Sequence, residues 1–364
     1  MRGAGLKVRV DRFGNLVGRT AAPARGARTL LMGSHLDTVR DAGRFDGALG
    51  VLLPIAALEV LRSRGKTLPF GVEVLGFSEE EGVRFSSAYL GSKGYAGLMG
   101  KADLRLRDPA GISVGEALAG GRGRRFTPPG PAHTSKELIG YLEVHIEQGP
   151  VLEELGIAAG VVSEIAGQTR ARIAFGGRAG HAGTTPMALR RDALAGAAEF
   201  ILAAEALARA RWPLVATVGR ILARPGAANV IAGAAELSLD VRHQADARRR
   251  SACAGLREAG RRIARRRGLT FSMQVTQDNG AVRCSRDLTA LLAASVRGRC
   301  VGLTSGAGHD GVIISSLAPI AMLFVRCRGG LSHHPREFVS RGDLESALGI
   351  VVGFLERLAS RPSQ

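Results

Sequence analysis

The stretch TLLMGSH at residues 29–35 decides the fold class of this chain, because it is a short apolar run that predicts a strand. A Gly-rich loop follows it. VLLPIAALEVL at residues 51–61 then predicts a helix with Pro54 in its first turn, where the missing N–H costs little. GVEVLGF at residues 71–77 predicts the next strand. Strands that alternate with helices in this way indicate an α/β sheet.

The segments on either side of this core add further strands. Alternating residues at 6–11, a turn at 12–15 and renewed alternation at 16–19 predict a hairpin. Residues 119–137 are rich in Gly, Pro and Arg, which indicates an irregular excursion. YLEVH at residues 141–145 then predicts another strand.

Between about residue 167 and residue 278 the pattern changes. Strands are predicted at residues 170–175, near 215–218, at 235–242 and at 270–275, and helices at 192–209 and 245–267. This β-α-β-β-α-β order indicates a small α+β sandwich of ferredoxin-like type, inserted into the larger domain.

The last stretch returns to the first domain. A helix after Asp287, the strand AMLFV at residues 321–325 and a helix over 341–358 would complete it. We therefore expect a mixed-sheet α/β domain over residues 1–166 and 279–364, interrupted by the α+β domain over residues 167–278.

Length and composition limit the class of protein. At 364 residues the chain exceeds a typical single domain, so two cores are expected. The content is 45% hydrophobic and 23% charged, and no apolar run reaches the roughly 20 residues that a membrane-spanning helix needs. The start MRGAGL lacks the apolar core of a signal peptide, so we expect a cytoplasmic protein without a membrane partner.

The net charge of +18 raises the question of nucleic acid. The basic clusters at residues 248–250 and 261–267 are typical of solvated helix faces, and 4% aromatic residues leave few rings for stacking bases. We expect anionic small molecules as partners and no nucleic acid. The four cysteines form no C-x-x-C pair, which argues against a disulfide framework or a thiolate zinc site.

Chemistry-bearing side chains gather where the predicted strands end. His35 and Asp37 leave the strand at 29–35, and because side chains two apart on a strand face the same way, Asp37 can orient His35. Asp46 follows within GRFDGALG at residues 43–50, whose glycines let the backbone approach a metal closely.

Three adjacent carboxylates, in SEEEG at residues 78–82, follow the strand at 71–77. A solvent-facing acidic turn is the simpler explanation of such a run. Beside a His-x-Asp strand, however, the repulsion between like charges is better explained if cations neutralise them. One carboxylate can then bind metal while its neighbour handles the proton of a water molecule.

Six of the eight histidines fall in Gly-rich loops at predicted strand ends. Each alone is more often structural, but loops at strand ends are where active sites are built, so the joint pattern favours a function. Imidazole and carboxylate ligands without cysteine suit a catalytic Zn²⁺, Mn²⁺ or similar ion. The six are His35, His145, His181, His309, His333 and His334.

Seven separated groups of motifs run in order from about residue 6 to the end. They are GSHLDTV with GRFDGALGVL, EEGVRF with LGS, YLEVHIEQGPVLE, GHAGTTPM with RRDA, ANVIAG with DVRH, SGAGHD, and GLSHHPREF. Together they resemble the allantoate amidohydrolase and N-carbamoyl-L-amino-acid hydrolase (hydantoinase/carbamoylase) family, within the wider group of dinuclear zinc peptidases and aminoacylases. The resemblance implies a zinc-peptidase-like catalytic domain with an inserted ferredoxin-like dimerisation or lid domain.

The resemblance also implies a set of site residues in the larger domain. Two divalent ions are expected, Zn²⁺ first and Mn²⁺, Co²⁺ or Ni²⁺ as alternatives, with Asp46 bridging them. Glu80 would act as general base on a metal-bound water that attacks the substrate carbonyl, and Asp37 would be a catalytic residue beside His35. The ligands implied are His35, Asp46, Glu81, His145 and His333.

In the smaller domain, His181 resembles the oxyanion-stabilising histidine that reaches the partner subunit's active site, so a homodimer is implied. Asn229 and Arg242 resemble the residues that hold the substrate carboxylate, for which a planar guanidinium is suited. Gln168, Arg170 and His309 are further substrate-binding candidates. For Arg170, an exposed strand arginine is an equal alternative.

The hypothesis favoured by these residues is hydrolysis of a carbamoyl or ureido group in N-carbamoyl-L-amino acids or allantoate. A dipeptidase or aminoacylase of the wider group is an alternative, but peptidase relatives typically carry a carboxylate where His145 stands. A non-enzymatic metal-binding remnant is a second alternative. Relatives usually carry a helical segment of several tens of residues before the stretch that begins at Leu6, and in this sequence only five residues precede it.

Overall fold

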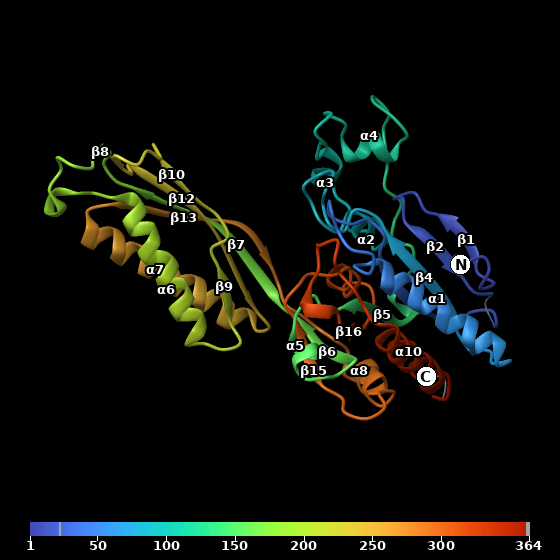
Figure 1. Cartoon of the computed structure of the whole chain (residues 1–364). Helices are drawn as coiled ribbons and strands as arrows, with labels where there is room; N and C mark the ends of the chain where they lie inside the picture. Colours follow the sequence, from blue (N-terminus) through green and yellow to red (C-terminus); the bar gives the residue numbers. More distant parts are fainter. Residues whose placement is uncertain (22, 362–364) are drawn as a thin grey trace. The chain divides into compact units, whose positions relative to one another are not determined.

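The computed structural model describes residues 1–21 and 23–361, which fall into two compact units (Figure 1). Unit 1 comprises Met1–Ile165 and Arg283–Gln364, and unit 2 comprises Ala166–Val282. The expected borders were 166/167 and 278/279, and the observed borders are 165/166 and 282/283. The second border lies later in the chain than expected, and the last long strand of unit 2 continues past residue 278 to Asn279. Residues 22 and 362–364 of the expected larger domain lie outside the described residues.

A nine-stranded mixed sheet forms the centre of the larger unit, in the order β1-β2-β4-β3-β5-β16-β6-β14, with β15 paired to β6. The neighbours β4, β3, β5 and β16 are parallel, so their carboxyl ends lie along one edge. The bounds are β1 (Lys7–Val10), β2 (Leu16–Arg19), β3 (Thr29–His35), β4 (Gly71–Phe77), β5 (Leu138–Ile146), β6 (Ala159–Ile165), β14 (Val282–Arg283), β15 (Gly302–Ser305) and β16 (Ile320–Val325).

The central strands are apolar because both faces of the sheet are covered. Every residue of β3 and of β4 is buried. On one face, side chains such as Leu30, Met32 and Val72 pack in a single core with α1 (Ala48–Ser63), α8 (Arg286–Ala293) and α10 (Arg341–Ala359). The other elements of this unit are α2 (Leu90–Tyr95), α3 (Lys101–Arg105), α4 (Val114–Leu118), η1 (Ser135–Glu137), α5 (Val151–Glu154), α9 (Gly311–Ile314) and η3 (Arg328–Gly330).

The expected position of Pro54 in α1 is wrong. The helix begins at Ala48, so Pro54 lies in its interior and is buried. The residue before the helix, Gly47, has a φ of 68° and provides no side-chain cap. No capping side chain therefore marks the true start of α1 in the sequence.

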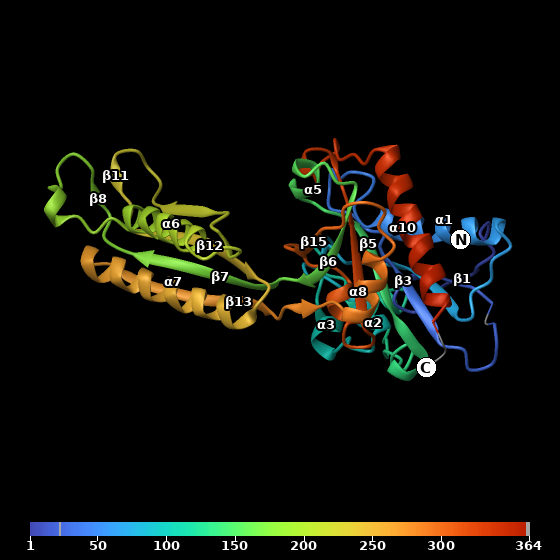
Figure 2. The ribbon, with the colours of Figure 1, turned by 90° about the horizontal axis from the view of Figure 1, so that it is seen from below.

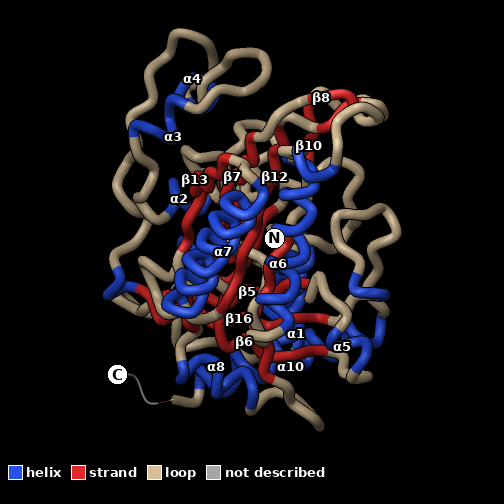
Figure 3. Tube along the Cα trace, turned by 90° about the vertical axis from the view of Figure 1, so that its left-hand side faces the viewer, coloured by secondary structure: helices blue, strands red, loops and turns tan. Residues whose placement is uncertain are grey.

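Unit 2 has the expected ferredoxin-like architecture. Its antiparallel five-stranded sheet has the order β10-β12-β7-β13, with β9 paired to β12, and α6 and α7 lie side by side on one face (Figure 2 and Figure 3). Residues alternate between buried and more exposed along β7 and β12, because only that face carries helices. The bounds are β7 (Gly167–Gly176), α6 (Ala193–Arg209), β9 (Val215–Thr217), β10 (Ile221–Arg224), β12 (Ala234–His243), α7 (Asp246–Arg267) and β13 (Thr270–Asn279).

Two features of unit 2 were not predicted from the sequence: the strand β10 and a second, small sheet. β8 (Gly180–His181) and β11 (Val230–Ile231) pair as a separate two-stranded sheet, with η2 (Met187–Leu189) between them in sequence. Two-residue strands carry too little pattern to be recognised. No helix within residues 1–21 and 23–361 has both the length and the apolar character needed to span a bilayer.

Candidate metal centre

Side chains from five places in the chain meet at the carboxyl edge of the parallel strands. His35 ends β3, His145 lies near the end of β5, and Glu81 follows β4. Asp46, just before α1, is at the centre of the group. Its carboxylate lies 3.1 Å from His145 Nε2, 3.8 Å from His35 Nε2 and 3.2 Å from His333 Nε2, and His333 Nε2 is 3.3 Å from Glu81 Oε1. The five expected ligands thus converge.

The ligating atoms form overlapping triads in which all atoms lie within 4.8 Å of one another. Asp46 belongs to two of these triads, as expected for a carboxylate that bridges two cations. Glu80 joins a third triad rather than either of those two. The triads are His35, Asp46 and His145; Asp46, Glu81 and His333; and His35, Glu80 and Glu81.

The tautomers of two imidazoles show that this set fits a metal. His35 Nδ1 lies 2.8 Å from the Asp37 carbonyl oxygen, and His145 Nδ1 lies 2.9 Å from the Ile146 carbonyl oxygen. A carbonyl only accepts, so each Nδ1 carries a hydrogen, and Nε2 is the atom through which each ring could bind a metal. These two Nε2 atoms are 3.4 Å apart and both face Asp46. Two ring nitrogens and a carboxylate that face one another in this way suit a shared cation.

The pKa values show that the group stabilises positive charge. Burial would raise the pKa of Asp46, but hydrogen bonds with His145 and His333 outweigh it and hold that pKa far below its usual range. Burial would lower the pKa of His145, yet the hydrogen bond to Asp46 leaves it above its usual value. Hydrogen bonds to Asp46 and Glu81 raise the pKa of His333 to about 10.

Glu80 has the environment of a general base. It is buried, and its Oε2 lies 4.0 Å from His35 Nε2. Burial, followed by the charges of Asp310 and Glu81, raises its pKa well above the usual range. A carboxylate with a raised pKa accepts a proton more strongly, which suits it to withdraw one from an attacking water.

The expectation that the Asp37 side chain orients His35 is wrong. β3 ends at His35, so the two residues do not share a strand face, and the Asp37 backbone carbonyl contacts the ring instead. The Asp37 carboxylate accepts hydrogen bonds from the N–H groups of Glu80 and Glu81, at 3.1 Å each. Asp37 therefore holds the segment that carries Glu80 and Glu81.

His309, expected as a substrate-binding residue, packs against the centre. Its ring lies edge-on to that of His145, with centroids 4.5 Å apart, and Nε2 is 2.8 Å from Ser305 Oγ. The side chain is 1% exposed, and burial holds its pKa well below the usual value. A neutral His309 thus supports the His145 ring.

Three substrate-binding candidates of unit 2 converge on Asp240. Arg242 Nε donates to Asp240 Oδ1 at 2.9 Å, Gln168 Nε2 donates to Oδ2 at 2.7 Å, and Arg170 Nε donates to Oδ2 at 3.1 Å. All four residues lie on adjacent strands, β7 and β12. One carboxylate is therefore shared by two guanidinium groups.

His181 and Asn229 lie on the exposed β8–β11 segment of unit 2. The His181 Nδ1 accepts hydrogen bonds from the N–H groups of Gly183 and Thr184, at 3.1 and 3.2 Å. Its Nε2 therefore carries the hydrogen and is a donor. The Asn229 carbonyl oxygen accepts from the Ala182 N–H at 2.9 Å and keeps the two loops together.

Three polar side chains around Asp46 were not identified from the sequence. They are Gln148, Ser332 and Glu337, which hydrogen-bond to the Asp46 side chain or backbone. Gln148 lies inside the motif YLEVHIEQGPVLE, and Ser332 and Glu337 lie inside GLSHHPREF. Their place in these motifs was the only sign in the sequence that they could belong to the site. Their contacts join segments that are 102 to 291 residues apart, which no local pattern reveals.

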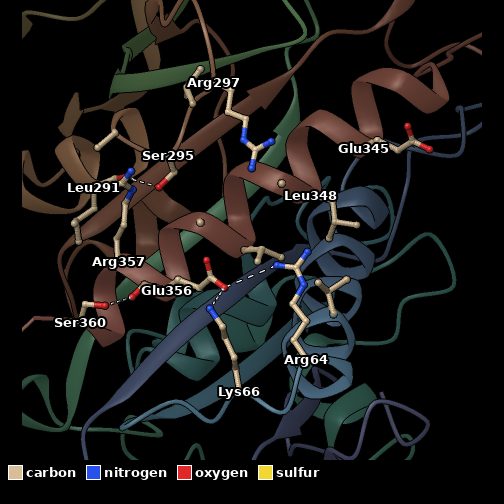
Figure 4. Close-up of a pocket in the computed structure, with 16 residues that line it drawn as sticks. Arg64, Lys66, Leu291, Ser295, Arg297, Glu345, Leu348, Glu356, Arg357 and Ser360 are labelled. Carbon is tan, nitrogen blue, oxygen red and sulfur yellow. Dashed lines mark hydrogen bonds and ion pairs between the residues drawn. The ribbon is translucent and has the colours of Figure 1, made fainter.

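A cavity of about 970 Å³ lies elsewhere in unit 1, along α1, α10 and the turn after α8 (Figure 4). Glu356 pairs there with Lys66 at 2.7 Å and with Arg64 at 3.9 Å. None of the candidate metal ligands lines this cavity. Its position is therefore distinct from that of the chemistry at the strand ends.

Comparison with known proteins gives consistent similarities. Residues 31–359 match the model of peptidase family M20/M25/M40. Allantoate deiminase 2 of Glycine max is 38% identical over 400 residues, which cover 99% of this chain and 81% of that protein. The N-carbamoyl-L-amino-acid amidohydrolase of Pseudomonas sp. (strain NS671) is 38% identical over 356 residues, covering 94% and 85%. A hydantoinase/carbamoylase family amidase from Burkholderia multivorans superposes with a TM-score of 0.92 at 31% identity, covering 100% and 88%.

Proposed function

The chain belongs to peptidase family M20/M25/M40, within its allantoate amidohydrolase and N-carbamoyl-L-amino-acid hydrolase group, and from this premise we propose its reaction. It is a hydrolase of carbon–nitrogen bonds other than peptide bonds, which cleaves the carbamoyl or ureido group of N-carbamoyl-L-amino acids or allantoate. The observation that carries the proposal is the convergence of the Asp46-centred triads with Glu80 at one edge of the sheet.

We infer two divalent ions, because Asp46 belongs to two triads that otherwise share no residue. His35 and His145 would complete one ion's protein ligands, and Glu81 and His333 the other's. Imidazole and carboxylate donors suit Zn²⁺ first, with Mn²⁺, Co²⁺ or Ni²⁺ as alternatives. When bound, the ions supply Lewis-acid polarisation of the scissile carbonyl and activation of a water molecule.

Glu80 carries the proton in the proposed reaction. As the attacking water adds to the carbonyl carbon, Glu80 accepts its proton, and then donates this proton to the departing nitrogen. Asp37 supports the step because its carboxylate fixes the backbone of Glu80. His309 keeps the His145 ring in place from behind.

The smaller unit supplies the groups for substrate recognition in this proposal. Arg242 and Asn229 hold the substrate carboxylate, with Gln168 and Arg170 fixing the local arrangement through Asp240. His181 presents an N–H donor that stabilises the developing oxyanion of the partner subunit's substrate. Unit 2 would then be the dimerisation or lid domain of a homodimer, which we place in the cytoplasm.

Ammonia release from a substrate panel tests the reaction. Metal-reconstituted protein should release ammonia from allantoate, N-carbamoyl-L-amino acids or N-carbamoyl-β-alanine, with Zn²⁺, Mn²⁺, Co²⁺ or Ni²⁺. Glu80→Gln should lower the rate by about 10²- to 10⁴-fold, the usual contribution of a general base. Glu79→Gln, one residue outside the pair, is the matched control. No ammonia from any substrate, or equal activity of Glu80→Gln and wild type, would overturn the proposal.

A further inference from the structure

Glu337 is a buried carboxylate that joins the two loops presenting Asp46 and His333. It is 3% exposed and lies between β16 and α10. Its Oε1 accepts hydrogen bonds from the N–H groups of Phe45 and Asp46, at 2.8 and 3.0 Å. Its own N–H donates to the His334 carbonyl oxygen at 2.9 Å, which closes the turn beside His333. One side chain thus ties both loops.

A second set of contacts runs from Glu337 to the Asp46 carboxylate itself. The Ser332 hydroxyl lies 2.9 Å from Asp46 Oδ2 and 3.3 Å from Glu337 Oε2. Gln148 Nε2 donates to Asp46 Oδ2 at 3.2 Å and to Ser332 Oγ at 3.1 Å. Both the backbone and the side chain of Asp46 are therefore held by one network.

The surrounding residues leave Glu337 little freedom. A Cβ at Gly43 would lie 2.3 Å from Glu337 Cβ and 2.4 Å from Oε1, so only glycine permits the close approach. The ring of Phe338 contacts that of Phe45 at a centroid distance of 6.2 Å, and Arg328 lies 4.2 Å above the Phe338 ring. The Glu337 side chain is therefore closely packed against the loop that carries Asp46.

We propose that Glu337 is a positioning residue that sets the place of the bridging carboxylate Asp46 relative to His333. This inference rests on the proposed function, since it concerns the ligands of the same centre. Groups that orient metal ligands commonly contribute 10- to 100-fold to metal affinity. Glu337 differs from most such groups because it holds the backbone of one ligand and the loop of another at once.

Three variants separate this role from general stability. Glu337→Ala removes the acceptor of both N–H groups. Glu337→Gln keeps an oxygen in the same place, and its amide can donate to Ser332 Oγ, which leaves the hydroxyl hydrogen for Asp46. Glu116→Ala is the matched control, because Glu116 in α4 also accepts from two backbone N–H groups and one serine hydroxyl.

The first measurement is amide hydrogen exchange of the metal-free protein. In Glu337→Ala, the amides of Phe45 and Asp46 should exchange at least about tenfold faster, because protection depends on the local hydrogen bond. Glu337→Gln should stay close to wild type, and Glu116→Ala should change exchange only near α4. Unchanged exchange at both amides in Glu337→Ala would overturn the inference.

The second measurement is a Co²⁺ titration followed by the visible absorption of the bound ion. Glu337→Ala should bind Co²⁺ about 10- to 100-fold more weakly with an altered spectrum, whereas Glu337→Gln and Glu116→Ala should retain both properties. Faster exchange with unchanged Co²⁺ affinity would also overturn the positioning role. If wild type itself bound no Co²⁺, the proposed function would fail instead, and exchange would still decide whether Glu337 joins the two loops.

Discussion

Two buried clusters of carboxylate and imidazole lie in unit 1, one around Glu73 and one around Asp46. In the Glu73 cluster, the Tyr95 hydroxyl donates to Oε2 at 2.8 Å, and His133 Nε2 and Arg19 Nη1 lie 3.3 and 3.5 Å from Oε1. Each carboxylate oxygen thus has a donor from the protein. Burial tends to raise the pKa of Glu73, but the hydrogen bonds from His133 and Tyr95 prevail and lower it.

The Asp46 cluster is built differently. Two further carboxylates, Glu80 and Glu81, lie beside it, and Nε2 of His35 and Nε2 of His145 face one another at 3.4 Å. Three carboxylates and three imidazole rings therefore gather around one point, and each offers a ligand atom. The difference between the clusters teaches that burial of a carboxylate beside histidine is not itself a sign of a metal centre, whereas several carboxylates and imidazole nitrogens directed at one point are.

The largest expected difference between the clusters is in activity. Asp46→Asn removes the charge shared by both triads, and we expect hydrolysis to fall by about 10³-fold, since metal polarisation contributes several kcal/mol. Glu73→Gln makes the same chemical change in the other cluster and should leave turnover close to wild type. Ammonia release by the folded variants checks this pair, and similar losses in both would remove the distinction.

Metal removal should separate the clusters next. At a metal concentration of 100 times Kd, binding stabilises the folded state by about 2.7 kcal/mol, which chelation would abolish. Wild type and Glu73→Gln should lose this stabilisation equally, as measured by denaturant unfolding with and without chelator. Asp46→Asn should show almost none to lose. If chelator no longer affected the stability of Glu73→Gln, the metal would bind in the Glu73 cluster, which would contradict its assignment to the Asp46 cluster.

The Glu73 cluster should affect stability through pH. A lowered folded-state pKa adds stability that is complete above the unfolded pKa, near 4.3, and is lost as the pH falls through the folded value. At pH 7, the free energy of unfolding of Glu73→Gln should therefore be about 1.5–3 kcal/mol lower than that of wild type. The difference should shrink below about pH 4.3. A difference that grew on acidification would contradict this account.

The smallest effect is expected from a single donor of the satisfied cluster. The Tyr95 hydroxyl is buried, and burial followed by the charge of Glu73 raises its pKa well above the usual range, so it remains a donor. Tyr95→Phe should cost about 0.5–1.5 kcal/mol in the free energy of unfolding. Co²⁺ affinity should not change. A weaker Co²⁺ site in this variant would show that the clusters are coupled.

The strands and a group of histidines and carboxylates at their ends could be predicted because their signals are local, whereas the set of five ligands was implied by the family resemblance. Apolar runs mark β3 and β4, and the motifs that follow them carry His35, Glu80 and Glu81. What a local pattern cannot reveal is where a side chain points after the strand has ended. Asp37 is an example, because its carboxylate lies against the backbone of Glu80 and Glu81 in the loop after β4.

Long-range contacts and uncapped ends account for the remaining differences. Glu337 meets Phe45 across 292 residues, so its role emerges only from the folded chain. The start of α1 was missed because Gly47 offers no capping side chain, and Pro54 was therefore misplaced. Family resemblance supplied the separation of Glu80 from Glu81, and the structure adds the burial that raises the pKa of Glu80.

The most direct test of the central claim is a titration of metal-free protein with Co²⁺, in which bound metal and ammonia release from an N-carbamoyl-L-amino acid are measured together. We expect negligible release without metal and full release as two ions bind per chain. Full hydrolysis by protein free of metal, or binding of two ions without hydrolysis of any ureido substrate, would contradict it.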